Sequence, residues 1–364
     1  MDSRRSRKGT ALSTDPTADR PSSLAGIVER FPAARIVVVG DVIADEFVDG
    51  EIARVSREAP VMILRYQSTR TIPGGGGNAA ANGAALGGSV ALVSRIGRDR
   101  AGRAVTLALR EAGVDTTGIA SVRGEATPTK TRIHAGLPHS IHQQVIRIDR
   151  EPEAPNAETA TVLARRLEAA LSTADVCIVS DYGYGVADGP VADVIAAARA
   201  RGVRTIVDSR YRLRAFAGAT AATPNEAELE ELVGARIESD ADVVEAASLV
   251  STELGLEAML VTRGSRGILL LERGRDALLL PIVGSAQAVD VTGAGDTVIA
   301  TFALAVASGA SYADAARLAN HAGGLVVMKR GTATVSNAEL AEAVGEGKEG
   351  FAYREHRGSE DTKQ

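Results

Sequence analysis

The stretch Val289-Asp290-Val291-Thr292-Gly293-Ala294-Gly295-Asp296-Thr297 is followed directly by the apolar run Val298–Ala305. Glycines at 293 and 295 allow the backbone to turn sharply and leave main-chain N–H groups bare where a buried helix begins. The amides and the helix dipole both favour an anion at that point. The stretch therefore predicts a phosphate site at the start of a buried helix.

Asp296 lies in the first turn of that helix, beside the predicted phosphate. A carboxylate is the wrong charge for holding a phosphate, but it is suited to taking a proton from a hydroxyl that attacks one. An aspartate in a first turn also pairs favourably with the helix dipole, and glycine turns before helices are common. The stretch favours phosphoryl transfer only if other parts of the chain support it.

Regular alternation of strands and helices indicates the fold. Arg35–Asp41 is a β-branched run of the kind buried on both faces, and from Val176 onward short apolar strands alternate with helices. This pattern predicts a parallel sheet with helices on both faces. Asp181 and Asp208 end two of the strands, at the edge where such sheets bind ligands. The segments near 46–72 and 128–150 alternate and are less apolar, which predicts antiparallel strands apart from the main sheet.

Composition excludes several classes of protein. The chain has 364 residues, 45% of them hydrophobic, and a net charge of −5 with dispersed Lys and Arg, so no nucleic-acid partner is expected. No run reaches the length of a membrane span. The single Cys177 excludes an intramolecular disulfide and fits a reducing, cytoplasmic location. Residues 1–24 and 345–364 read as loose tails.

The glycine run Pro73–Asn78 predicts a very close approach of the backbone to another group. Gly75, Gly77 and Ala80 also match the dinucleotide fingerprint, but the preceding residues are polar and end in proline rather than forming a core strand. We expect no dinucleotide there. Asp41 and Asp45 follow the first strand and are candidates for holding sugar hydroxyls, and the alternative is a turn aspartate together with a solvated one.

Asn225 and Glu228 lie three residues apart and face the same way on a predicted helix. They are suited to ordering water around a magnesium ion, but the same spacing describes an ordinary capping box. Val261–Gly267 is a strand that leads into a basic, glycine-rich turn, which favours nucleotide phosphates.

Gly74–Asn78, Asn225–Glu228 and Asp290–Asp296, in this order, resemble the ribokinase-like (PfkB) family of sugar kinases over about Arg35 to Val344. Ser56–Val61 and Ser180-Asp181-Tyr182 are closest to the heptose-phosphate kinases that make a precursor of ADP-heptose. The resemblance implies a three-layer α/β/α sandwich over 25–344, with a small β-sheet lid and often a homodimer through that lid. The nucleotidyltransferase domain of bifunctional relatives is not expected, because no H-x-G-H pattern occurs.

The resemblance also implies roles for individual residues. Asp296 would be the base, with the amides of Gly293, Ala294 and Gly295 as the anion hole. The sugar would be held by Asp41, Asp45, Gly75, Gly76, Asn78, Arg132, Gln144, Arg147 and Asp181. The ATP site would be lined by Asn225, Thr262, Arg263, Gly264, Gly267 and Asn320. Asn225 and Glu228 would order water on Mg²⁺, and Asp290 and Thr292 would lie beside a K⁺ site.

Two departures from the heptose-kinase pattern affect the substrate. Tyr184 stands where a lysine is usual, and Ser209-Arg210 replaces Pro-Lys after Asp208. Because basic residues pair with a substrate phosphate, the candidates to replace them are Arg132, Arg147, Arg210 and Arg212. The expected reaction is transfer from ATP to a sugar or sugar-phosphate hydroxyl, foremost D-glycero-D-manno-heptose 7-phosphate. The alternatives are a kinase for ribose, fructose or a nucleoside, and a non-catalytic sugar- or nucleotide-binding protein.

Overall fold

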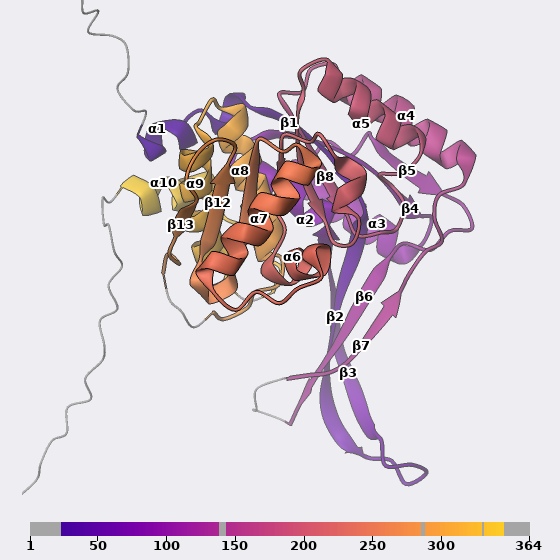
Figure 1. Cartoon of the computed structure of the whole chain (residues 1–364). Coiled ribbons are helices and arrows are strands. Elements are labelled where there is room, and N and C mark those ends of the chain that lie inside the picture. Colours follow the sequence, from indigo (N-terminus) through magenta and orange to yellow (C-terminus); the bar gives the residue numbers. More distant parts are fainter. Residues whose placement is uncertain (1–22, 138–142, 285–287, 330, 346–364) are drawn as a thin grey trace, which may run out of the picture.

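The computed structural model describes residues 23–137, 143–284, 288–329 and 331–345. The main body is a nine-stranded sheet between two layers of helices, and a four-stranded sheet projects away from it as a long arm (Figure 1). Most of the two expected tails lies outside these ranges. Of the described tail residues, Leu24 begins the first helix and Gly345 ends the last.

The main sheet has the strand order β13-β12-β11-β10-β9-β8-β1-β4-β5, and its neighbours from β11 to β5 are parallel. The strands are β1 (Arg35–Gly40), β4 (Ser89–Gly97), β5 (Ile119–Val122), β8 (Val176–Asp181), β9 (Arg204–Ser209), β10 (Ala221–Ala222), β11 (Ala258–Thr262), β12 (Ile268–Glu272) and β13 (Leu278–Leu280). The predicted three-layer, mostly parallel architecture is confirmed. The antiparallel edge formed by β12 and β13 was not predicted.

Alternating side chains of β1 build the two faces of the sheet. Ile36 and Val38 belong to one buried cluster, and Val37 and Val39 belong to the other. The first cluster lies under α1 (Leu24–Val28), α2 (Gly76–Ala85), α3 (Arg100–Glu111), α8 (Ala294–Ala307), α9 (Tyr312–Val326) and α10 (Asn337–Gly345). The second lies under α4 (Ala157–Leu171), α5 (Pro190–Ala200), α6 (Glu226–Val233) and α7 (Asp240–Leu254). A strand buried on both faces reads as a continuous apolar run, as β1 does.

Helix α8 is buried along almost its whole length, from Asp296 to Val306. Its apolar run therefore packs against the helices α9 and α2 and against the strands β8, β1 and β9, and it has no polar face. The prediction of a buried helix after the glycine turn is confirmed. This burial fixes the first turn of α8 against α2, which carries the glycine-rich segment.

The arm is a separate sheet with the order β3-β2-β6-β7, made of β2 (Val42–Val55), β3 (Met62–Gly75), β6 (Thr129–Gly136) and β7 (Gln143–Arg150) (Figure 1). β2 begins two residues after β1 ends, so Asp45 lies within a strand and not in a turn. The antiparallel strands expected near 46–72 are the two long strands β2 and β3, which pair along almost their whole length. We call this sheet the lid.

The chain changes direction across the sheet at β1. It passes from β1 to β4 and β5 on one side and returns through β8 on the other side. A crevice forms outside the carboxyl ends of the strands at such a point, and ligands bind there. No helix within the described ranges combines the length and apolar character that crossing a bilayer requires.

Candidate active site

A cavity of about 500 Å³ lies at the carboxyl ends of the strands, bounded by the lid on one side and by the start of α8 on the other. Its polar lining includes five carboxylates and three cations. The lining residues are Ile43, Asp45, Gly75, Lys130, Arg132, Asp181, Tyr182, Asp208, Arg210, Thr223, Asn225, Glu228, Thr262, Val291, Thr292, Gly293, Gly295, Asp296 and Thr332.

Asp296 lies at the wall of this cavity and is 5% exposed. Its carboxylate accepts a hydrogen bond from Asn78 Nδ2 at 2.7 Å and another from the Tyr182 hydroxyl at 3.3 Å. Burial raises the pKa of Asp296 to about 7, while the hydrogen bonds from Asn78 and Tyr182 oppose that rise. A carboxylate with a pKa near neutrality is suited to accept a proton at physiological pH.

The turn before α8 presents bare amides to the same cavity. Gly293 is the N-cap residue, with a left-handed φ of 79° that favours glycine. Within the described part of the chain, the N–H groups of Gly293, Gly295 and Asp296 have no hydrogen-bond acceptor. The Ala294 N–H donates to Val291 O at 3.2 Å. Of the three amides expected to form an anion hole, that of Ala294 already donates to another residue. The amide of Asp296 has no acceptor among the described residues and takes its place in the candidate site.

The glycine-rich segment packs against the end of β1, as its sequence predicts. A Cβ at Gly75, where φ is 57°, would lie 2.6 Å from Asp41 O. A Cβ at Gly74 would lie 2.3 Å from an Asp45 carboxylate oxygen. This close approach places Asn78, three residues further on, in contact with Asp296. Gly75 lines the cavity, whereas Gly76 lies behind it, with its N–H on Asp41 O.

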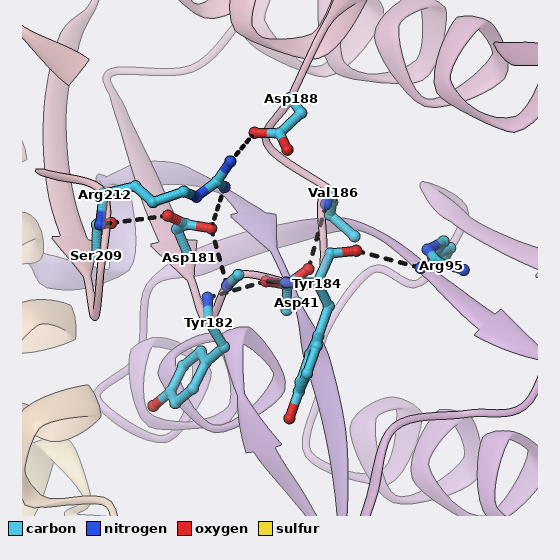
Figure 2. A network of polar contacts seen from close by, with 10 residues as sticks. Asp41, Arg95, Asp181, Tyr182, Tyr184, Val186, Asp188, Ser209 and Arg212 are labelled. Carbon is cyan, nitrogen blue, oxygen red and sulfur yellow. Dashed lines mark hydrogen bonds and ion pairs between the residues drawn. The ribbon is translucent and has the colours of Figure 1, made fainter. Parts of the chain in front are cut away.

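Asp41 is not part of the cavity lining, so the structure does not bring it to the space where the sugar is expected. Its carboxylate is 1% exposed and accepts hydrogen bonds from the backbone N–H groups of Tyr182, Tyr184 and Val186 (Figure 2). The residue sits at the switch point and its side chain holds the loop after β8 in place. This contact orients Tyr182, whose hydroxyl reaches Asp296.

Asp181 lines the cavity in part, and its carboxylate accepts hydrogen bonds from three neighbours, one of which is the N–H of Gly183. It accepts hydrogen bonds from the Ser209 hydroxyl at 2.7 Å and from Arg212, which also pairs with Asp188 (Figure 2). Arg212 is therefore bound between two carboxylates and does not line the cavity. Of the four arginines that the sequence proposes for a substrate phosphate, Arg132 and Arg210 line the cavity.

Lys130 is a cavity residue that the sequence analysis missed. It lies on β6 of the lid, with its ammonium nitrogen 5.4 Å from the centroid of the Tyr182 ring. Burial lowers the pKa of Lys130, and the positive charges of Arg210 and Arg147 lower it further. The alternation of β6 places Lys130 on the same face as Arg132, which is the one signal that identifies it from sequence.

The remaining lid candidates lie differently. Arg132 forms an ion pair with Asp45, and both line the cavity. Arg147 pairs with Asp149 on the exposed strand β7, and neither Arg147 nor Gln144 is part of the cavity lining.

Asn225 and Glu228 form the capping box that the spacing allowed. The Glu228 N–H donates to Asn225 Oδ1, and the Asn225 N–H donates to Glu228 Oε2, each at 2.9 Å. Both residues also line the cavity. The second carboxylate oxygen of Glu228 takes no part in the box, so capping and a role in the cavity are compatible.

Three carboxylates crowd the same end of the cavity. Burial raises the pKa of Asp208 well above its usual range, and the charges of Glu228 and Asp296 raise it further. Such a set is relieved by a cation. Within the described residues, no cluster of three or more His, Cys, Asp or Glu side chains is arranged to coordinate a metal directly. The set therefore fits a divalent ion held through water and phosphate oxygens.

The expected nucleotide residues divide into two groups. Thr262 lines the cavity beside Asn225, with its N–H on Pro224 O. Arg263 is 5% exposed and pairs with Glu226 and Asp240 instead of facing the cavity. Gly264 and Gly267 shape the turn after β11, where a Cβ at Gly267 would lie 2.1 Å from Leu280 O.

The last candidates shape loops near the cavity. Asn320, on α9, donates to Pro281 O at 2.7 Å and lies outside the cavity. Asp290 accepts hydrogen bonds from the N–H groups of Thr292 and Gly331, each at 2.9 Å, and so joins the turn before α8 to the segment after α9. Thr292 lines the cavity.

Most of this chain matches a known protein family. The family model described as pfkB family carbohydrate kinase matches residues 33–339. The bifunctional protein HldE of Mesorhizobium japonicum is 42% identical over 327 residues, which cover 89% of this chain and 64% of that protein. The chain therefore spans somewhat less than two thirds of the length of that curated relative.

Solved structures show the same fold. The Arabidopsis thaliana ribokinase complexed with ribose and ATP superposes with a TM-score of 0.66 at 25% identity, over 85% of this chain and 98% of that one. Phosphofructokinase-2 from Escherichia coli in complex with potassium gives a TM-score of 0.71 at 22% identity, over 86% of this chain and 98% of that one.

Proposed function

Because the chain belongs to the pfkB family of carbohydrate kinases, we propose that it transfers the γ-phosphoryl group of ATP to the anomeric hydroxyl of D-glycero-D-manno-heptose 7-phosphate. The observation that carries this proposal is the charge distribution of the cavity. A buried carboxylate lies at one end beside amides that have no acceptor among the described residues, and two cations that form no ion pair with any of those residues face the same space.

The residues of the cavity divide the chemistry between them. The sugar oxygen attacks the γ-phosphorus, the bond from that phosphorus to the β–γ bridging oxygen breaks, and ADP leaves with the electron pair. Asp296 receives the proton of the sugar hydroxyl, and Asn78 and Tyr182 hold its carboxylate in place. The N–H groups of Gly293, Gly295 and Asp296 stabilise the charge on the transferred group.

Two ions complete the proposed site. Bound Mg²⁺ would neutralise charge on the β- and γ-phosphates. Glu228, Asp208 and Asn225 would hold it through water, since Glu228 keeps one carboxylate oxygen outside the capping box. K⁺ would sit beside Asp290 and Thr292, in the turn that presents the amides. The potassium complex of the phosphofructokinase-2 structure, which shares the fold, supports this second assignment.

Lys130 and Arg210 are the proposed anchors for the 7-phosphate. Among the described residues neither forms an ion pair, whereas Arg132 and Arg212 are paired with Asp45 and Asp181. Two neighbouring cations that repel each other and face a cavity are stabilised by an anion between them. These two residues would take the place of the lysines usual in heptose kinases.

Lys130→Met and Arg210→Met are each expected to raise KM for the phosphosugar by about 10- to 100-fold, because a charged hydrogen bond to phosphate is lost. The KM for a sugar without that phosphate should not change. Steady-state ADP release over both substrates measures the difference. Arg65→Met is the matched control, because Arg65 is an exposed lid arginine paired with Glu51. Equal losses for both substrates would contradict the phosphate assignment.

We also propose that the protein forms a homodimer through the lid. Directly opposed residues of neighbouring strands share a face, so Ile133 and Ile146 lie on one face and Phe47 and Arg132 lie on the other. Ile146 and Ile148 are 51% and 53% exposed on this apolar face, and the lid projects from the body (Figure 1). A second copy of the lid would cover it.

Ile148→Lys is expected to convert the dimer to a monomer, because a charge would be buried in the apolar face. Sedimentation velocity measures the change. Leu249→Lys, at a 61% exposed leucine of α7, is the matched control and should leave the dimer intact. A wild-type chain that sediments as a monomer at all concentrations would overturn the dimer proposal.

A coupled ADP-release assay over a panel of acceptors tests the function itself. The proposal predicts the highest kcat/KM with heptose 7-phosphate. Preference for ribose, fructose or a nucleoside would leave the enzyme class intact and replace the substrate. Binding of ATP and sugar without turnover in the presence of Mg²⁺ and K⁺ would indicate a non-catalytic binding protein.

A further inference from the structure

A series of buried, hydrogen-bonded polar side chains connects Thr297 on α8 to the carboxylate of Asp296. Asn78 and Asn82 lie on α2, Thr297 lies on α8, and their exposed fractions are 2%, 0% and 0%. Thr297 Oγ1 lies 2.9 Å from Asn82 Oδ1, and Asn82 Nδ2 lies 3.0 Å from Asn78 Oδ1. Asn78 Nδ2 then lies 2.7 Å from Asp296 Oδ2.

In each hydrogen bond of this series, only one assignment of donor and acceptor is satisfactory. An ionised carboxylate accepts hydrogen bonds and donates none, so Asn78 must turn its nitrogen toward Asp296 and its oxygen toward Asn82. Asn82 must then donate to that oxygen, which leaves its own oxygen facing Thr297. The Thr297 hydroxyl is the group that donates to it, since its alternative acceptor, Gly293 O, is at 3.4 Å.

We propose that Asn82 and Thr297 are positioning residues, which fix the amide of Asn78 with its nitrogen on Asp296 and so hold that carboxylate ready to accept a proton. The proposal rests on the proposed role of Asp296 as the base. Neither residue lines the cavity, so both act through Asn78 and not on the substrate.

Reversal of the Asn78 amide would place its oxygen against the carboxylate oxygen, and a buried amide with an unmatched partner is costly. Asn82 prevents this reversal because its nitrogen already donates to Asn78 O at 3.0 Å, which leaves its second hydrogen directed at Asn78 Oδ1. Thr297 donates to the oxygen of Asn82 and so stabilises the same orientation of that amide. The hydroxyl on α8 therefore supports, through Asn82, the orientation in which the nitrogen of Asn78 meets the carboxylate.

The other groups that face Asp296 come from other elements. Substitutions at Asn82 or Thr297 would leave these groups unchanged. Asp45 from β2 and Asp208 from β9 bring negative charge, Lys130 from β6 brings positive charge, and the Tyr182 hydroxyl follows β8. The hydrogen bond from Asn78 opposes the rise that burial produces in the pKa of Asp296. Loss of the amide orientation should therefore raise that pKa.

Thr297→Val keeps the shape of the side chain and removes its hydroxyl. It is expected to move the acid limb of kcat/KM to higher pH by about one unit, which is a roughly tenfold loss of rate below pH 7. Thr297→Ser should restore the wild-type profile. Thr301→Val is the matched control, because Thr301 is also 0% exposed on α8 but its hydroxyl donates to Thr297 O at 2.7 Å.

A carboxyl ¹³C NMR titration of Asp296, with its signal assigned by Asp296→Asn, reads the same effect without turnover. The pKa should rise in Thr297→Val and stay unchanged in Thr301→Val. Asn82→Leu removes the hydrogen bond from Asn82 to Asn78 and should also raise the pKa of Asp296. This second variant keeps the test decisive if Thr297→Val folds poorly. An unchanged pKa in folded Thr297→Val or Asn82→Leu would overturn the proposal. Absence of phosphoryl transfer in the wild type would overturn the kinase function and not this result.

Discussion

Asp296→Asn is expected to lower kcat by about 10²- to 10⁴-fold and to leave the Kd for ATP unchanged. The amide keeps the size of the side chain but does not accept the proton of the sugar hydroxyl. ADP release measures turnover, and calorimetric titration of the nucleotide measures binding. A loss confined to kcat would indicate an interaction made in the transition state.

The alternative role of Asp296 is a favourable charge at the start of a helix. Asp314 provides the control, because it is an acid in the first turn of α9 and lies outside the cavity. Asp314→Asn should leave kcat unchanged. Since the pKa of Asp296 is raised to about 7, wild-type kcat/KM should increase with pH through that value as the carboxyl ionises. Wild-type turnover in Asp296→Asn would rule out its role as the base.

Gly293→Ala is expected to lower kcat/KM by about 100-fold, which is the scale of a small misplacement of catalytic groups. The backbone there has a φ of 79°, and the added Cβ would lie 2.4 Å from Asn78 Nδ2. The methyl group must displace Asn78 from Asp296 or shift the turn that presents the amides. Steady-state kinetics and a thermal unfolding curve together measure the two effects.

A second glycine beside α8 separates the effect of backbone strain from the effect of displacing Asn78. Gly309 follows the other end of α8 with a φ of 80°, and a Cβ there would meet no atom within 4 Å. Gly309→Ala should therefore show the loss of stability that a left-handed alanine causes, about 1 kcal/mol, without the loss of activity. Equal activity losses in both variants would show that general destabilisation explains the effect at Gly293.

Local sequence was enough to predict the parts of the site that depend on the backbone. The glycine turn at 293–295 and the run at 74–77 require special conformations or close approaches, and both occur where the chain predicts them. The apolar run after Asp296 has no polar face, so a buried helix was the only stable outcome. The alternation of strands and helices determined the sheet in the same way.

Side chains whose partners are distant in sequence were not predictable. Asp41 looks available for a sugar, but the loop after β8 brings three N–H groups to it, 141 to 145 residues further along the chain. Arg263 looks suited to phosphate, yet the start of α7 supplies a carboxylate that binds it. Lys130 and Arg210 are the opposite case, because both line the cavity and neither forms an ion pair with another residue in the described part of the chain.

Antiparallel β12 and β13 were missed because short apolar segments carry no signal of direction. The capping box at Asn225 shows a different limit. The spacing of Asn225 and Glu228 suits both a helix start and a cavity site. In the structure the two residues cap α6 and also line the cavity, because the capping box uses only one of the two Glu228 carboxylate oxygens.

The most direct test of phosphoryl transfer in this cavity is ³¹P NMR of a mixture of the protein, ATP, Mg²⁺ and heptose 7-phosphate. The account predicts that the γ-phosphate signal of ATP is replaced in equal amount by a sugar phosphate signal at the anomeric position, with the 7-phosphate retained. Release of inorganic phosphate alone, or ATP left intact beside bound sugar, would contradict it.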